Sequence, residues 1–260
     1  MKSFFKYSIV MFLSIMMLSL SFVNLSQAKI TEVDLSSAVG IWLFDEGSGD
    51  STKDISSKGN HAKLTKDPKW ISGKFGKALE FNGKDNCVQT EKKLLDNLTE
   101  FSIMFWMKTG KTTGTRIGLV GQNNSPEFGF ENPNTLWLWT PAGDLKAPWK
   151  QSQPSKNWHH IAGVASKKEM KIYIDGKVAS KGNGGGPFGS SPFNVNVGGC
   201  GIWDAAGNWF TGAMDEVAIF HNALDDAAIN KIMKSGFKAM TTAVDPKNRL
   251  AITWGQIKKP

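Results

Sequence analysis

The sequence predicts an all-β fold, a sandwich or jelly roll of short antiparallel strands with one short helix near the C-terminal end. Residues 157–180, NWHHIAGVASKKEMKIYIDGKVAS, contain two β-runs closed by Asp175-Gly176, a dipeptide that accepts the positive φ angles of a tight hairpin turn. Before the turn, Met170, Ile172 and Ile174 alternate with more polar residues, which is the two-residue period of a strand with one buried side. Short strands with turn residues at this spacing are typical of a sandwich.

Further apolar runs along the chain predict the other strands. Pro126, Pro133 and Pro141 punctuate several of them. The predicted strands are residues 39–44, 78–81, 87–89, 101–107, 117–121, 127–130, 135–140, 195–198 and 213–220.

One helix is predicted after the last strand. Asp225 is suited to cap its N-terminus, Ile229, Ile232 and Met233 supply an apolar stripe, and Gly236 can end it. We therefore expect one domain over residues 29–236. Residues 237–260 form a basic tail that either packs on the domain or links to something outside it.

The N-terminal residues 1–28 resemble a cleaved signal peptide. Lys2 and Lys6 give a positive start, residues 9–23 are almost wholly apolar, and small residues precede the expected cleavage after Ala28. The alternative, a transmembrane anchor, is disfavoured because the apolar run contains serines and is shorter than the roughly 20 residues that a bilayer needs. We expect a secreted or extracytoplasmic product with no membrane span after the signal is removed.

The chain is basic, with a formal charge of +8, which falls to +6 when residues 1–28 remove Lys2 and Lys6 and no acid. A basic surface attracts acidic polysaccharide, nucleic acid or a membrane surface. Here the lysines are spread through loops rather than massed in one run, so a solvated surface is the preferred interpretation, and no nucleic-acid partner is expected.

Cys87 and Cys200 are the two cysteines of the sequence. An even, low count in an exported protein predicts one disulfide, and these two residues leave a single possible pairing. An oxidising compartment also disfavours a catalytic thiol, since oxidation would compete for it.

Eight sequence blocks in order resemble a laminin-G-like jelly-roll domain of the concanavalin A-like lectin/glucanase superfamily. They cover nearly the whole mature chain up to Gly236. The blocks are GIWLFDEGSG (40–49), SSKGNHAKL (56–64), GKFGKALEFNGKDNCVQT (73–90), FSIMFWMK (101–108), NWHHIAGV (157–164), MKIYIDGKVAS (170–180), NVNVGG (194–199) and GAMDEVAIFHNALDDAAINKI (212–232). The resemblance implies two curved antiparallel sheets and a ligand met on the concave face or at the loop rim.

The resemblance also implies a possible structural calcium ion. Calcium takes six to eight oxygen ligands, and Asp45, Asp85 and Asp215 lie at strand ends within the matched blocks. No contiguous loop forms a dedicated site, and the alternative role of these aspartates is to shape turns and strand ends.

The sequence holds no evident catalytic constellation. A retaining glucanase on this fold would resemble a strand bearing Glu-x-Asp-x-x-Glu, and Glu32-x-Asp34 lacks the third acid. Asp215 and Glu216 are adjacent, so on a regular strand they point to opposite faces and cannot act together on one bond. We expect no enzymatic activity.

Tryptophan is abundant, with ten residues against two tyrosines, and flat indoles suit stacking on the apolar faces of sugar rings. Trp137 and Trp139 share one face of a strand, where paving the concave surface and filling the core are both open. The preferred ligand loop is residues 202–210. The remaining candidate ligand residues lie in loop-like surroundings and are Trp149, Trp203, Asp204, Asn208 and Trp209.

These observations favour a secreted, non-catalytic recognition module that binds a carbohydrate or another extracellular surface ligand, including a protein. Two alternatives stay open. One is a hydrolase or lyase whose acids are scattered rather than grouped in a motif, and the other is a purely structural secreted domain.

Overall fold

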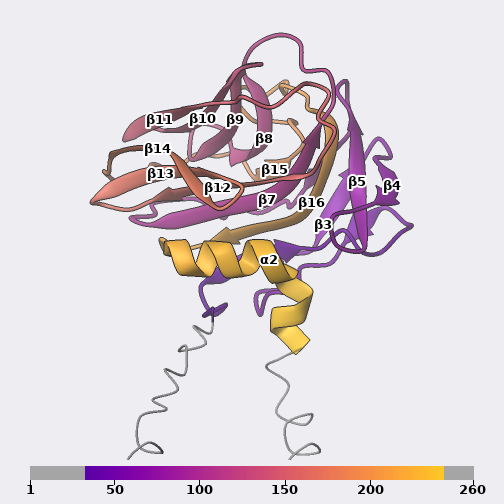
Figure 1. The fold of residues 1–260 in the computed structure, drawn as a ribbon, viewed down its shortest axis with the longest axis horizontal. Helices are drawn as coiled ribbons and strands as arrows, with labels where there is room; N and C mark the ends of the chain where they lie inside the picture. Colours follow the sequence, from indigo (N-terminus) through magenta and orange to yellow (C-terminus); the bar gives the residue numbers. More distant parts are fainter. Residues whose placement is uncertain (1–32, 243–260) are drawn as a thin grey trace, which may run out of the picture. The chain divides into compact units, whose positions relative to one another are not determined.

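Two antiparallel sheets of eight strands face one another in the computed structural model of this chain, which describes residues 33–242 (Figure 1). This arrangement confirms the predicted all-β jelly-roll sandwich. The predicted signal peptide, residues 1–28, and the chain beyond residue 242 lie outside the described residues.

The first sheet pairs its strands out of sequence order. In spatial order it contains β14 (Lys177–Asn183), β13 (Glu169–Ile174), β12 (His159–Ala165), β7 (Phe101–Thr109), β16 (Thr211–Phe220), β5 (Lys77–Asn82) and β4 (Lys69–Ser72), and β1 (Ala38–Trp42) pairs with β16.

The second sheet contains the shorter and more polar strands. Its order is β11 (Gly143–Pro148), β10 (Thr135–Thr140), β9 (Glu127–Asn132), β8 (Ile117–Gln122), β15 (Val195–Val197), β6 (Cys87–Gln89), β3 (Ala62–Thr65) and β2 (Ser51–Thr52).

The strands with strict apolar alternation were the easiest to predict. The predicted bounds of β6 and β10 match the structure, and the Asp175-Gly176 turn joins β13 to β14 with φ angles of 51° and 74°. Residues 157–180 hold three strands rather than two, because β12 precedes the hairpin. The strands β2, β3, β4 and β11 were not predicted, since their short sequences are mostly polar.

The main core lies between the two sheets. Ile103, Phe105 and Met107 of β7 point into it from the first sheet, and Phe128 of β9 and Leu138 of β10 meet them from the second. The rings of Phe105 and Phe128 pack edge to face with centroids 5.8 Å apart. Burial of alternate residues from both sheets is what holds the sandwich together.

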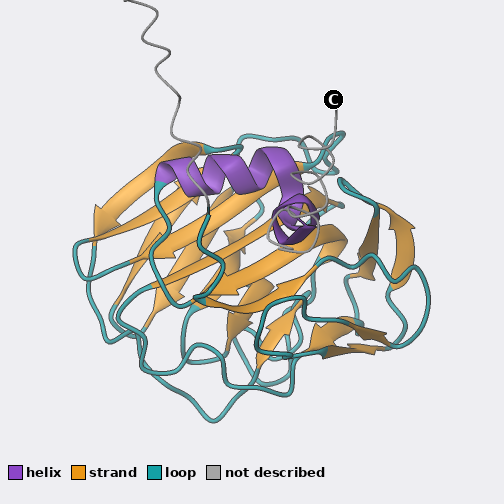
Figure 2. Cartoon of the chain, turned by 90° about the horizontal axis from the view of Figure 1, so that it is seen from below, coloured by secondary structure: helices purple, strands orange, loops and turns teal. Residues whose placement is uncertain are grey.

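The outer face of the first sheet is covered by helix α2 (Asp226–Thr242), which crosses it in Figure 2. The Asp225 carboxylate accepts a hydrogen bond from the Ala228 N–H at 2.8 Å, which confirms the predicted N-cap. The buried side chains of this second core belong to Met104, Tyr173, Ala218, Phe220, Ile229, Ile232 and Phe237, among others.

Gly236 interrupts α2 without ending the packed structure. Its φ of 68° and ψ of 168° break the helix, and a second helical segment follows. Phe237 and Met240 of that segment are buried in the second core. The first residues of the expected tail therefore pack on the domain.

Cys87 and Cys200 form the predicted disulfide, with their Cα atoms 5.9 Å apart. The bond joins β6 to the segment after β15, across a sequence separation of 113 residues.

Asp215 and Glu216 do not face opposite ways, contrary to the expectation for a regular strand. The pairing of β16 with β7 shifts register between Asp215 and Ala218, and Glu216 adopts a φ of 53°. Because Met214 and Val217 both enter the main core, the two acids between them lie on its outer side.

Both acids hold backbone groups of other elements. Asp215 accepts from the N–H groups of Lys74 and Phe75 at 2.8 and 2.9 Å, and Glu216 accepts from that of Phe237 at 2.6 Å. Burial raises the pKa of Asp215 to about 8 and that of Glu216 to about 7. Their contacts are structural: they join the β4–β5 turn and α2 to the first sheet.

Candidate functional site

The outer face of the second sheet is the open face of the described structure. Trp137 and Trp139 point out from β10, while Leu136 and Leu138 between and beside them enter the core. The structure thus decides between the two alternatives for this tryptophan pair: both residues lie on the outer face, and both are partly exposed.

Residues 198–210, here called the crossing loop, run over this face. Two paired glycines, Gly118 on β8 and Gly129 on β9, let the loop lie directly on the sheet. A Cβ atom at Gly118 would stand 2.6 Å from the Ile202 Cβ, and one at Gly129 would stand 3.0 Å from the Trp203 Nε1. A larger side chain at Gly118 would press on the loop, and one at Gly129 would meet the backbone carbonyl of Ile117 on β8 before it met Trp203.

Trp203 anchors the crossing loop. Its indole stacks on Trp137 with ring centroids 4.7 Å apart and an angle of 16° between the planes. The backbone N–H of Trp203 donates to the Glu127 carboxylate at 3.0 Å, and its backbone carbonyl accepts from the Arg116 guanidinium. Trp203 is 4% exposed. It was predicted as a rim residue, and the structure gives it instead a positioning role.

Glu127 is a buried carboxyl at this anchor. Burial raises its pKa to about 7, and the N–H groups of Asn124 and Trp203, together with the charge of Arg116, act in the opposite direction. Because the ionised form accepts both N–H bonds, the charge state of Glu127 affects how firmly the crossing loop is held.

A groove lies on the other side of the crossing loop, over β15, β6 and β3, and is here called the Trp209 groove. Its volume is about 530 Å³, within the range of small-molecule sites. The Cys87–Cys200 disulfide forms part of its wall. Its lining residues are Thr65, Cys87, Gln89, Glu91, Pro192, Phe193, Asn194, Asn196, Cys200, Gly201, Ala205, Ala206 and Trp209.

Asn196 is an amide residue on the floor of the groove. It lies between the core residues Val195 and Val197, so its side chain points to the outer face. It is 7% exposed and lines the groove. Its Oδ1 is buried and has no hydrogen-bond partner among the described residues, a state that costs free energy in the protein as described.

A comparison with protein families finds a match over residues 82–230 to the model described as concanavalin A-like lectin/glucanases superfamily. The chain belongs to this superfamily. A search of curated sequences found no significant match.

Solved structures with the same fold include domain 4 of AbnA, an extracellular arabinanase of family GH43 from Geobacillus stearothermophilus, in complex with arabinotriose. The two chains are 19% identical with a TM-score of 0.61, over 76% of this chain and 98% of that one. The binding domain of Paraclostridial Mosquitocidal Protein 1 is 17% identical with a TM-score of 0.59, over 78% of this chain and 53% of that one.

A third such structure is that of botulinum neurotoxin type C, a toxin described as dependent for cell entry on interaction with two ganglioside molecules. It is 18% identical with a TM-score of 0.57, over 77% of this chain and 51% of that one. The chain thus spans about half the length of the two toxin chains. At these identities the likeness concerns the fold.

Of the predicted ligand residues, Trp209 lies in the wall of the groove that carries its name. Asp204 closes a turn of the crossing loop by accepting from the Gly207 N–H at 2.9 Å. Asn208 fixes the loop through its backbone, donating to the Gly199 carbonyl and accepting from the Gly118 N–H, each at 2.8 Å.

Trp149 was predicted at the rim, and the structure places it in the main core instead. It is 3% exposed and packs edge to face against Phe130 and His159. The Gly- and Pro-containing sequence that suggested a loop forms β11 in the structure. Trp149 follows the last residue of this strand, and its side chain is buried. Trp137 has both ring faces occupied, by Trp203 on one side and by the Lys146 ammonium 4.9 Å from the centroid on the other.

The groove residues that the sequence interpretation missed are Thr65, Gln89, Phe193, Asn194 and Asn196. A signal for two of them was present, because Gln89 follows the core residue Val88 and Asn196 lies between two valines. Polar residues that alternate with core residues on a central strand lie on its outer face. Phe193 and Asn194 come from the preceding loop and had no such signal.

The three aspartates predicted as calcium ligands each make hydrogen bonds within the protein. Asp45 accepts from the Lys77 N–H at 2.9 Å, Asp215 holds the same β4–β5 turn, and Asp85 bonds to the side chain of Asn82 at 2.8 Å. Within residues 33–242, no three acidic, histidine or cysteine side chains gather in a way that could hold a metal ion. Calcium binding stays a prediction.

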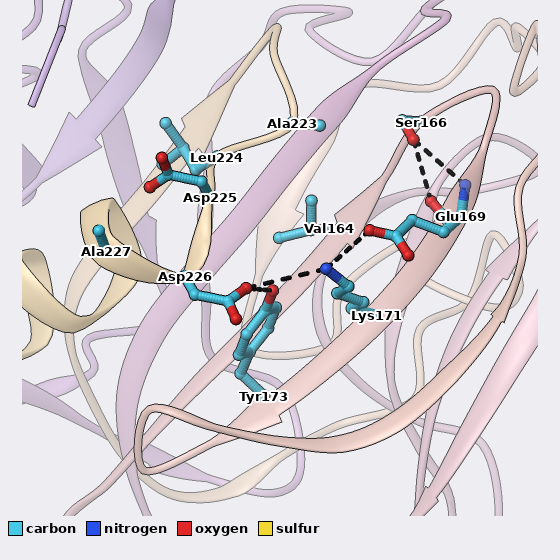
Figure 3. Close-up of a pocket in the computed structure, with 10 residues that line it drawn as sticks. All are labelled: Val164, Ser166, Glu169, Lys171, Tyr173, Ala223, Leu224, Asp225, Asp226 and Ala227. Atoms are coloured by element: carbon cyan, nitrogen blue, oxygen red, sulfur yellow. Dashed lines mark hydrogen bonds and ion pairs between the residues drawn. The ribbon is translucent and has the colours of Figure 1, made fainter.

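A second cavity, of about 450 Å³, lies on the outer face of the first sheet beside the start of α2 (Figure 3). Its polar groups are paired with one another. The Tyr173 O–H donates to Asp226 at 2.6 Å, and the Lys171 ammonium lies 2.7 Å from Glu169 and 3.8 Å from Asp226. Hydrogen bonds from Lys171 and Lys181 lower the pKa of Glu169 to about 2. This network fastens α2 to β13.

No helix in the described part of the chain has the length and apolar character needed to cross a membrane.

Proposed function

We propose that this protein is a secreted, non-catalytic recognition module that binds a carbohydrate in the Trp209 groove. The observation that carries the proposal is the presence of an aromatic ring and two amide side chains, Trp209 with Asn194 and Asn196, in one open groove. A sugar ring has an apolar C–H face that stacks on an indole and hydroxyl groups that donate to amide oxygens. The groove offers both kinds of contact.

The lining of the groove supports binding rather than turnover. Glycoside hydrolysis by two carboxylates requires a pair about 5–9.5 Å apart. Among the groove residues, Glu91 is the single carboxylate, and it pairs with the Lys63 ammonium at 2.9 Å. Glu127, the nearby acid with a raised pKa, is occupied in holding the crossing loop.

Secretion is supported by the signal-like residues 1–28 and by the Cys87–Cys200 disulfide, since such bonds persist in oxidising compartments. The domain of the extracellular arabinanase with bound arabinotriose and the neurotoxin whose cell entry depends on gangliosides share this fold, and their ligands make a glycan the first class to test here. Trp139, partly exposed beyond the crossing loop, is a proposed second contact for a longer ligand.

A glycan array with the purified chain and Trp209→Ala tests the proposal. We expect the wild type to bind a defined set of glycans and the variant to lose at least about tenfold in affinity, roughly 1.4 kcal/mol. Trp158→Ala is the matched control, because it removes a partly exposed tryptophan beside β12 of the other sheet. Equal loss in both variants, or an array with no bound glycan, would reject the groove as a carbohydrate site.

Release of reducing ends from a bound polysaccharide distinguishes the alternative. Turnover that persists in a repeatedly purified sample and disappears in Glu91→Gln would replace the recognition module with a hydrolase. Without such release, the non-catalytic assignment holds.

A further inference from the structure

The charge of the Trp209 groove differs from that of the whole chain. The chain carries 31 Lys and Arg against 23 Asp and Glu, a formal charge of +8, which by itself favours acidic ligands. The groove lining contains no lysine, arginine or histidine and one carboxylate, that of Glu91. Long-range attraction and local recognition therefore point to different ligands.

The polar groups on the groove floor are neutral. Asn194, Asn196, Gln89 and Thr65 contribute amides and a hydroxyl, and the Thr65 hydroxyl already donates to Gln89 at 2.9 Å. Lys63, which lies on the same strand face as Thr65, is engaged with Glu91 at 2.9 Å, and both side chains are largely exposed at the rim. An anionic group that entered the groove would lose its hydration without meeting a cation.

The Glu91 carboxylate at the rim adds a directional requirement. As an exposed acceptor it favours a donor from the ligand. A sugar hydroxyl can donate, whereas a carboxylate or sulfate offers acceptors alone. The mismatch leaves two acceptors facing each other, in addition to the loss of hydration.

We propose that the Trp209 groove selects neutral, hydroxyl-rich glycans and rejects their acidic counterparts, although the protein as a whole is basic. This inference rests on the proposed function and narrows its ligand class. The basic surface attracts polyanions from a distance and weakly, and the groove decides which sugar is held.

The experiment compares matched ligands. Neutral hexose trisaccharides (cellotriose, maltotriose and galactotriose) and arabinotriose are tested beside the uronic-acid trisaccharides derived from the hexoses, in which a carboxylate replaces each C6 hydroxymethyl group. Affinities are measured for the full chain and for Trp209→Ala, in about 0.05 M and about 0.5 M salt, where the Debye length falls from roughly 14 to roughly 4 Å. Binding in the groove is defined as the part that Trp209→Ala abolishes.

We expect groove binding to favour the neutral member of a pair by at least about tenfold and to change little with salt. Acidic ligands bound equally well or better, with loss in Trp209→Ala, would overturn the selectivity while leaving a carbohydrate site. Groove binding absent for both classes would overturn the proposed function itself. Acidic binding that survives Trp209→Ala and vanishes in high salt is surface attraction, which supports the distinction drawn here.

A charge variant tests the cause. Glu91→Lys places a cation at the groove rim, and we expect the neutral-to-acidic affinity ratio to fall by about tenfold. Glu91→Gln removes the negative charge without adding a positive one, and it should move the ratio by a smaller factor. A ratio unchanged in Glu91→Lys would show that local charge does not govern selection.

Discussion

The outer faces of the two sheets are built from similar strands and are used in opposite ways. On the first sheet, Tyr173 and Lys171 point outward and are covered or paired by the start of α2, so their polar groups find partners within the chain. On the second sheet, Asn196 points outward into an open groove and its amide oxygen has no partner within the described range. A paired face stabilises the fold, and the partly exposed Trp209 ring lies on the open face, where we propose that a ligand binds.

The covered face can be broken at Phe237, which is fully buried on α2 and packs on Phe220 with ring centroids 6.1 Å apart. Phe237→Ala should lower the free energy of unfolding by about 3–5 kcal/mol, because it leaves a cavity in the second core. Denaturant unfolding measures the loss. A change below about 1 kcal/mol would mean that α2 contributes little to covering the sheet. Ile229→Val, with an expected loss of about 0.5–1.5 kcal/mol, serves if Phe237→Ala does not fold.

The Cys87–Cys200 disulfide of the second sheet gives a test of the open face. Cys87→Ser or Cys200→Ser should lower stability by about 2–5 kcal/mol, since the bond closes a long loop in the unfolded chain. Because both cysteines line the Trp209 groove, glycan affinity should fall in the same variants under conditions where they stay folded. Unfolding and binding measured with and without a dithiol give the comparison. If stability falls and glycan affinity does not change, the disulfide does not shape the groove.

The pH dependence of stability should follow the buried acids behind the covered face. Burial raises the folded pKa of Asp215 to about 8 and of Glu216 to about 7, above their usual values of 3.8 and 4.5. The folded state therefore binds more protons than the unfolded state, and stability decreases as pH rises from about 4 to about 8. Thermal unfolding across this range should show a midpoint that falls as the pH rises.

Glu216→Gln tests the assignment, because the amide oxygen can still accept from Phe237 but does not ionise. The decrease in stability with pH should become shallower in this variant. Glu127→Gln on the open face is the parallel change, with its effect expected on the crossing loop and hence on binding near neutral pH. If neither variant alters the slope of stability against pH, other titratable groups cause the pH dependence.

The smallest expected effect belongs to Tyr173→Phe, which removes the hydroxyl that donates to Asp226 and keeps the ring in place. Stability should fall by about 1 kcal/mol, with glycan binding unchanged because the residue lies on the other sheet. Chemical denaturation and the glycan assay measure the two quantities. Weaker binding in Tyr173→Phe would contradict the separate roles of the two faces.

Part of the candidate site could be predicted and part could not. The loop around Trp209 was identified from its aromatic and polar composition, and the alternation of Trp137 and Trp139 placed them correctly on one face. Trp149 and Trp203 lie in similar loop-like sequence, yet both are buried, because Phe130 and Trp137 meet them from other strands. Composition near a residue does not reveal which distant side chains cover it.

The sequence by itself determined the local features: the strands with strict alternation, the Asp175-Gly176 turn, the Asp225 cap and the pairing of the two cysteines. Each depends on neighbours within a few residues or on a count. Only the tertiary structure decided which sheet face stays open, because the cover of Tyr173 comes from Asp226, 53 residues away. It also decided that Asp215 and Glu216 share a side, since the bulge is set by pairing with β7. A two-residue period defines two faces of a strand, and long-range packing assigns one face to the core and decides whether the other is covered or stays open.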